Sequence, residues 1–287
     1  MSLLVVTGDL SSSSHSDSIA TALDHIRHAD FRRAYDLFAA GVLREAEGSV
    51  AWQEAIYGQA VCAEQVTPPS AERRAEARQL YEQLLAVAPE SRLAPRVWMD
   101  LGRMEELTGL RQTPNRLAAA RDYYGKVLEQ WPNESIAGEA TLRIAATWVQ
   151  AFEIEQVKRG VSILQHWLAS HPNDPLASAM WQYLGQTFFY PLESYEESLA
   201  CYLKADRLGL LEPGRAGIIY WRMATMADRL LGKRDVAAAY YTKIVTDAPT
   251  SGKAYEAQLA LRRLKVSVPD IQLFRRGRPD HEGQDEP

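Results

Sequence analysis

The sequence predicts an all-α protein in which helices follow one another in pairs, an architecture called an α-solenoid. Apolar residues recur at helical spacing along most of the 287 residues. Four prolines end such stretches, and each follows a small residue by twelve positions and a large residue by eight. The small, large and proline positions are Ala77, Tyr81 and Pro89; Ala120, Tyr124 and Pro132; Gly160, Leu164 and Pro172; Ala237, Tyr241 and Pro249. A small residue lets two helix backbones approach, a large one fills the groove between them, and proline ends the helix.

Taken in order, the chain divides into a leader, an array and a tail. We expect a flexible leader over residues 1–16, the helical array over 17–264, and a disordered polar tail over 265–287. In the first pair, Asp17 or Ser18 is expected to cap the first helix and Asp30 the second. Later pairs are expected at 50–65 with 71–88, 92–108 with 114–131, 134–151 with 155–170, 175–208 with a break at Pro191, and from Trp221 to Pro249. A last helix over 251–264 would cap the open end.

Composition bears on the partners the chain can have. The net charge is −5, and the one basic cluster, at Arg275, Arg276 and Arg278, is followed at once by acidic residues. We therefore expect no nucleic-acid partner. Insertion into a membrane is not expected, because no stretch approaches the length of apolar residues that a membrane helix needs. Cys62 and Cys201 lie far apart in apolar helical stretches, which favours two buried free thiols.

The first residues bear on location. MSLLVVTGDL has no basic region, its apolar run is short, and no cysteine follows for lipidation. Cytoplasmic location is therefore expected from the sequence as it stands. A periplasmic or cell-envelope location is expected instead if this N-terminus is processed or trimmed.

Residues with catalytic or metal-binding chemistry are sparse and scattered. His25 and His28 could lie on one helix face, but no further ligands stand at metal-site spacing, so we expect no metal. His171 is expected to interact with the end of its own helix. Nucleophile, zinc-protease and phosphate-loop motifs are absent from the sequence. We expect a protein that is not an enzyme and that needs no cofactor.

The repeated pattern resembles the tetratricopeptide repeat, W-x2-L-G-x2-Y, then A-x3-F, then P. Trp181, Leu184, Gly185 and Phe188 match the first half, and Trp98, Leu101 and Gly102 match most of it. Ala120, Tyr124 and Pro132 match the second half. The resemblance covers about 30–264 in roughly six units, and it implies a right-handed solenoid. Proline-to-proline steps of 43 and 40 residues are longer than the family standard, and Leu210 replaces one proline.

A second resemblance is to bacterial cell-envelope proteins of this type. APESRLAP, WPNESIAGEA and APTSGKAYEA each join a proline and a polar turn to alanines that enter the next helix. They are similar to repeats of the Tol–Pal coordinator and of outer-membrane assembly lipoproteins. This resemblance implies a scaffold in the bacterial cell envelope.

The family resemblance also implies where a partner would bind. In tetratricopeptide proteins the first helix of each pair lines a concave groove, through residues one, five and eight after the tryptophan position. The matching residues here are Met99, Arg103, Glu106, Gln182, Gln186, Phe189, Arg222, Met226 and Arg229. Such a mixed surface suits an extended peptide or a helix of another protein. Tyr190 and Tyr195, around Pro191, either form an aromatic patch at the groove edge or pack the lengthened turn.

The sequence therefore predicts a non-catalytic scaffold that binds a partner peptide or helix in its groove. One alternative is a structural subunit of a larger assembly, possibly in the cell envelope, that uses its convex or end surfaces. A lesser alternative is an enzyme or small-molecule binder with an unrecognised site.

Overall fold

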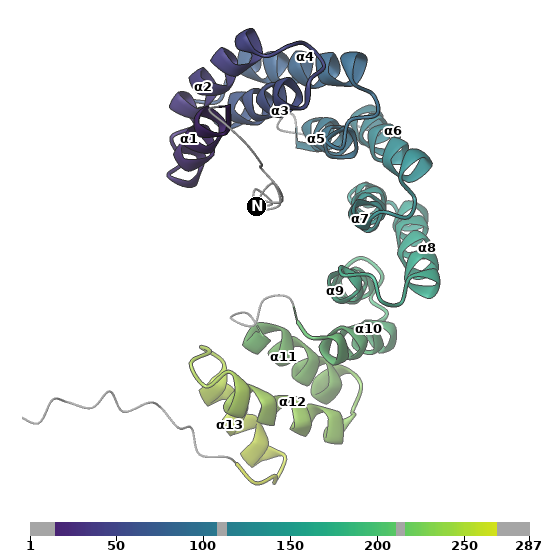
Figure 1. Cartoon of the computed structure of the whole chain (residues 1–287). Helices are drawn as coiled ribbons and strands as arrows, with labels where there is room; N and C mark the ends of the chain where they lie inside the picture. The colour runs from purple at the N-terminus through teal and green to yellow at the C-terminus, as the bar shows by residue number, and fades with distance from the viewer. Residues whose placement is uncertain (1–14, 108–113, 211–215, 269–287) are drawn as a thin grey trace, which may run out of the picture. The chain divides into compact units, whose positions relative to one another are not determined.

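The computed structural model describes residues 15–107, 114–210 and 216–268, and this part of the chain is helical without a strand. Figure 1 shows the helices in chain order. They are α1 His15–Arg27, α2 Phe31–Arg44, α3 Val50–Gln65, α4 Ala71–Val87, α5 Ala94–Leu107, α6 Pro114–Gln130, α7 Ser135–Val149, α8 Ile154–Ser170, α9 Ala177–Phe189, α10 Tyr195–Leu208, α11 Ala216–Thr225, a π-helical segment η2 Met226–Leu230, α12 Arg234–Asp247 and α13 Ala254–Arg263. The all-α prediction is confirmed.

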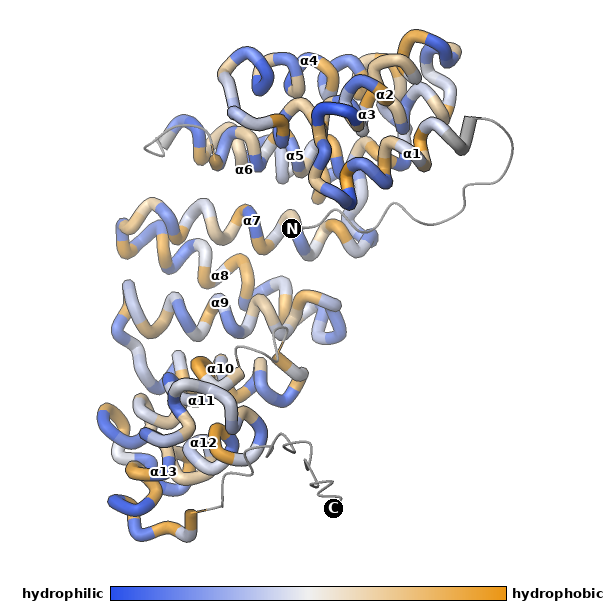
Figure 2. The backbone as a smooth tube through the Cα atoms, turned by 90° about the vertical axis from the view of Figure 1, so that its left-hand side faces the viewer, coloured by the Kyte–Doolittle hydropathy of each residue, from blue (hydrophilic) through white to orange (hydrophobic). Residues whose placement is uncertain are grey.

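The helices fall into two compact units, which we describe separately. The N-terminal unit, residues 1–151, contains α1 to α7, and the C-terminal unit, residues 152–287, contains α8 to α13. Within each unit, helices that are consecutive in sequence pack on each other, as α5 does on α6 and α9 on α10. Figure 2 shows apolar and polar residues alternating along the helices, as amphipathic packing requires.

Several helices begin where the sequence predicts, because a short polar side chain satisfies the first free backbone N–H groups. Asp30 accepts a hydrogen bond from the Arg33 amide, and Ser49 and Ser70 do the same for Trp52 and Arg73. The prediction for the first helix is wrong. Asp17 and Ser18 lie within α1, which already includes His15, so neither residue caps it. An acidic residue is also favourable within a first turn, which explains the misleading signal.

The contact between small residues and large rings is the main packing device. A Cβ atom on Gly102 of α5 would lie 2.4 Å from the Tyr124 ring of α6, and one on Gly185 of α9 would lie 2.9 Å from the Tyr202 ring of α10. Tyr124 and Tyr202 are buried. The glycines therefore provide the space in which these rings pack between paired helices.

Further sequence predictions can be compared with the structure. Cys62 and Cys201 are buried free thiols, as predicted. Trp52 is buried in the core of the N-terminal unit. The first helix of the sixth pair continues beyond α11 as the π-helical η2, which the sequence pattern did not indicate. Most of the predicted leader and tail, residues 1–14 and 269–287, lie outside the described residues.

Replacing Gly102 by Ala should destabilise the N-terminal unit by about 1–3 kcal/mol, because the added methyl group would overlap a buried ring. The free energy of unfolding from urea titration checks this. Gly125→Ala on α6 is the matched control, because no atom lies within 4 Å of its added Cβ. It should stabilise by up to about 1 kcal/mol, since alanine favours a helix over glycine. Equal effects at the two positions would contradict the packing role of Gly102.

Candidate partner-binding site

The three groove candidates on α5 take part in the interior of the N-terminal unit. Met99 packs in a buried cluster with Ala120 and Tyr124 of α6. Glu106 is 3% exposed and accepts a hydrogen bond from the Tyr124 hydroxyl at 2.8 Å. Arg103 is held between acidic side chains. These side chains are therefore already occupied by contacts within the unit.

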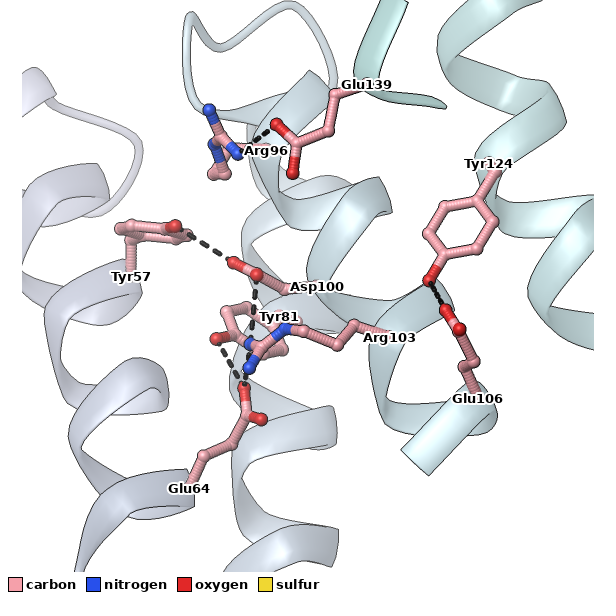
Figure 3. Close-up of polar contacts among 9 residues, drawn as sticks. All are labelled: Tyr57, Glu64, Tyr81, Arg96, Asp100, Arg103, Glu106, Tyr124 and Glu139. Atoms are coloured by element: carbon pink, nitrogen blue, oxygen red, sulfur yellow. Dashed lines mark hydrogen bonds and ion pairs between the residues drawn. The ribbon is translucent and has the colours of Figure 1, made fainter. Parts of the chain in front are cut away.

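Figure 3 shows the polar network around Arg103. Its guanidinium donates to Asp100 at 3.0 Å and to Glu64 of α3 at 3.2 Å. Tyr57 donates its hydroxyl to Asp100 at 2.9 Å, and Tyr81 of α4 donates to Glu64 at 2.8 Å. The network joins α3, α4 and α5 and places two carboxylates around one arginine.

Burial dominates the electrostatics of this network. It raises the pKa of Asp100 and of Glu64 above their ordinary values, although Arg103 opposes the shift in both. Burial lowers the pKa of Arg103, but Asp100 and Glu64 raise it, and the net shift is upward. The arginine therefore stays charged and compensates carboxylates that are costly to bury.

Among the described residues the same three-residue arrangement occurs three times, and we call it the Tyr–carboxylate–Arg cluster. A buried tyrosine of a second helix donates to a carboxylate of the first helix, and an arginine from the helix that follows the pair contacts that carboxylate. The clusters are Tyr81, Glu64 and Arg103; Tyr124, Glu106 and Arg143; and Tyr241, Asp228 and Arg263. The Arg143–Glu106 separation is 3.9 Å, and Tyr241 donates to Asp228 at 3.2 Å. Each cluster therefore links a helix pair to the helix that follows it.

The fifth pair has the tyrosine and the arginine without the carboxylate. Tyr202 stands eight residues before Leu210, as Tyr124 stands eight before Pro132. Its hydroxyl accepts a hydrogen bond from Arg222 of α11 at 2.8 Å. The guanidinium also lies 5.4 Å from the centre of the Tyr190 ring at the end of α9. Arg222 forms no ion pair with a carboxylate of the described residues.

Phe189 takes the place of the missing carboxylate in the sequence register. It lies four residues after Gly185, as Glu106 lies four after Gly102. Its ring makes edge contacts with Tyr190 and Tyr195 and packs against the core of the C-terminal unit. We call Arg222, Tyr202, Tyr190 and Phe189 the Arg222 site.

The remaining groove candidates lie in the C-terminal unit in different environments. Met226 is buried in the core. Gln182 is half-buried and donates to Ser178 at 3.3 Å. Gln186 and Arg229 are exposed, and Tyr190 is 57% exposed. The C-terminal unit therefore presents exposed polar and aromatic side chains of its first helices, whereas on α5 Met99 and Glu106 are buried and Arg103 is held in ion pairs.

The described residues were expected to hold no metal, and the structure shows how their potential metal ligands are arranged. No group of three potential metal ligands is close enough to hold an ion in the described ranges. His171 stacks on Trp167 with ring centres 3.8 Å apart and lies 3.3 Å from its carbonyl oxygen, as expected for a residue at a helix end.

An open pocket of about 530 Å³ between α8, α9 and α10 is lined by Trp181, Phe188 and Lys204 among others. None of the helices described is long and apolar enough to cross a membrane.

Sequence reasoning missed the Tyr–carboxylate–Arg clusters, although part of their signal is visible in the sequence. Glu64 and Glu106 each lie four residues after the small residue of their first helix, Ala60 and Gly102. The arginines stand at different places in the following helices and could not be assigned by spacing. Only the folded arrangement shows which carboxylate each of them reaches.

Comparison with solved structures identifies the type of fold. No protein-family model and no curated protein matches the chain. Among solved structures it is similar to PilW, a widely conserved type IV pilus biogenesis factor, with 18% identity over 88% of this chain and 100% of that one and a TM-score of 0.54. It is also similar to the C-terminal part of a TPR repeat-containing protein from Cytophaga hutchinsonii, with 12% identity, coverage of 86% and 87%, and a TM-score of 0.59.

A third similar structure is PilF of Pseudomonas aeruginosa, with 14% identity over 86% of this chain and 97% of that one and a TM-score of 0.55. At these identities the likeness defines the fold. The fold is that of tetratricopeptide-type helical repeats, and the resemblance predicted from the sequence motifs is confirmed at this level.

Replacing Arg103 by Met should destabilise the N-terminal unit by about 3 kcal/mol, because it leaves two largely buried carboxylates without their cation. Chemical denaturation followed by circular dichroism measures the loss. Arg32→Met, at an exposed position of α2, is the control and should change stability by less than about 0.5 kcal/mol. A loss at Arg103 no larger than that of the control would show that the network contributes little.

Stability should also depend on pH through Asp100. Burial raises the pKa of Asp100 in the folded state. The stability that this shift provides is fully present below the unfolded-state pKa, near 4, and is lost as pH rises through the folded-state pKa. The free energy of unfolding of the Asp100→Asn variant should therefore increase relative to that of the parent protein as pH rises from about 4. Urea midpoints at a series of pH values test this. A difference that moves in the opposite direction would contradict the burial effect.

Proposed function

We propose that the chain is a non-catalytic scaffold that binds a peptide or helix of another protein on the first helices of its C-terminal unit. The observation that carries the proposal is the contrast between equivalent positions in the two units. On α5, Met99 and Glu106 are buried and Arg103 is paired with Glu64 and Asp100. In the C-terminal unit, Gln186 and Arg229 are exposed, and the half-buried Arg222 pairs with no carboxylate of the described residues. The proposed surface therefore excludes Met99, Glu106 and Met226, which are buried.

The chemistry of this surface supports a protein partner. Arginine and tyrosine are enriched where proteins bind one another, because each combines a large apolar area with hydrogen-bonding groups. Tyr190 offers an exposed ring beside the Arg222 guanidinium, and Gln186 lies one helical turn before Tyr190 on α9. An extended peptide or a helix could use both the polar groups and the ring.

The alternative is a structural subunit of a larger assembly, and one observation favours it. One of the similar structures, PilW, is described as a pilus biogenesis factor. A role in assembly at the bacterial cell envelope would agree with the finer resemblance in the sequence. In that case the partner would be held by end or convex surfaces and not through α9 and α11.

Photo-cross-linking in the native cells distinguishes the two. A photoreactive amino acid at Gln186 should capture a protein partner that mass spectrometry can identify. The same photoreactive group at Glu155, an exposed position on α8, is the control for the second-helix surface. Capture at 155 without capture at 186 would contradict the proposal and favour the structural subunit. Capture at neither position would remove the support for the α9 and α11 surface.

A further inference from the structure

The Arg222 site differs from the other clusters of its kind by one acidic side chain. Tyr81, Tyr124 and Tyr241 donate to Glu64, Glu106 and Asp228, and each of these carboxylates also contacts an arginine. In the fifth pair the Tyr202 hydroxyl instead accepts a hydrogen bond from Arg222. The arrangement is that of a cluster to which the described residues contribute no anion.

The guanidinium of Arg222 is held in place by contacts with the protein. One guanidinium nitrogen is bonded to Tyr202, which is buried, and the group lies near the rings of Tyr190 and Tyr202. A guanidinium has five N–H donors, so others stay available for a second acceptor. Two acidic residues of α10 pair with lysines and not with Arg222: Glu196 with Lys233, and Asp206 with Lys243.

We propose that the partner supplies the missing anion, and that Arg222 binds an Asp or Glu side chain of an acidic peptide segment. The inference rests on the proposed function and names the chemistry of its partner. A side-chain carboxylate is the favoured source because Glu and Asp side chains fill the corresponding place in the other three clusters. Tyr190, exposed beside the guanidinium, would contact the apolar part of the same segment.

Phe189 offers Arg222 no anion, because an uncharged ring stands at the register position of the carboxylate in the other clusters. A glutamate there would stand four residues after Gly185, in the register of Glu106, and would compete with a partner for Arg222. Phe189→Glu should therefore close the site from within the chain. Phe189→Gln removes the same ring without adding charge and serves as the matched control.

The test selects peptides from a random library of short segments with both termini blocked, against the full chain and its variants. Peptides selected by the parent protein should share at least one Asp or Glu position. The preference should be lost on Arg222→Met and Phe189→Glu and kept on Phe189→Gln and Arg207→Met, the latter removing an exposed cation of α10. Replacing the shared acidic residue by its amide should weaken binding roughly tenfold or more, as for a charge-assisted hydrogen bond. Thermal melts confirm that each variant is folded.

The outcomes separate the inference from the function on which it rests. Selected peptides without an acidic preference, or a preference that survives Arg222→Met, would overturn the inference and leave the scaffold proposal standing. Binding that requires a free peptide C-terminus, when tested with unblocked peptides, would overturn the side-chain source. Failure of every protein to select any peptide would count against peptide binding itself, and the inference would fall with it.

Discussion

The packing of two helix pairs depends on the close contact between a tyrosine ring of the second helix and a glycine of the helix before it. Gly102 and Gly185 leave space for the rings of Tyr124 and Tyr202, and a methyl group in either place would overlap the ring. Burying a tyrosine brings its hydroxyl into the interior, where an unpaired polar group is costly. The hydroxyl therefore needs a partner, and in three clusters that partner is a carboxylate. A buried carboxylate in turn needs a cation, which an arginine of the following helix provides. A packing requirement thus leads to the polar linkage between a pair and the helix that follows it.

The fold could be predicted from the sequence because its packing device is local and periodic. The spacing of Ala120, Tyr124 and Pro132 is set within one helix, so it survives as a pattern in the chain. Element bounds agreed closely, and the main errors arose where local rules compete. Asp17 and Ser18 can cap a helix or lie within it, and α1 already includes His15. The π-helical η2 has no signature in the apolar spacing of the sequence.

The site was harder to predict, because it depends on which side chains meet across helices. Met99, Arg103 and Glu106 stand where the family pattern points to a groove, yet two of them are buried and the third is held by Asp100 and Glu64. Gln186 and Arg229 stand at positions of the same pattern and are exposed, and the half-buried Arg222 has no carboxylate partner among the described residues. The difference comes from long-range partners such as Glu64, which lies 39 positions before Arg103. Spacing along the chain does not reveal such partners.

The central claim is that Arg222 faces a place where the other clusters have a carboxylate, and a double-mutant cycle in the free protein tests it most directly. The free energies of unfolding of the parent, Phe189→Glu, Arg222→Met and the double variant give the coupling between positions 189 and 222. If Arg222 faces position 189, the introduced carboxylate and Arg222 attract each other, and the coupling is favourable by at least about 0.5 kcal/mol. It should also shrink at high salt. Additive effects of the two changes at low salt would contradict the account, because Arg222 would then not face position 189.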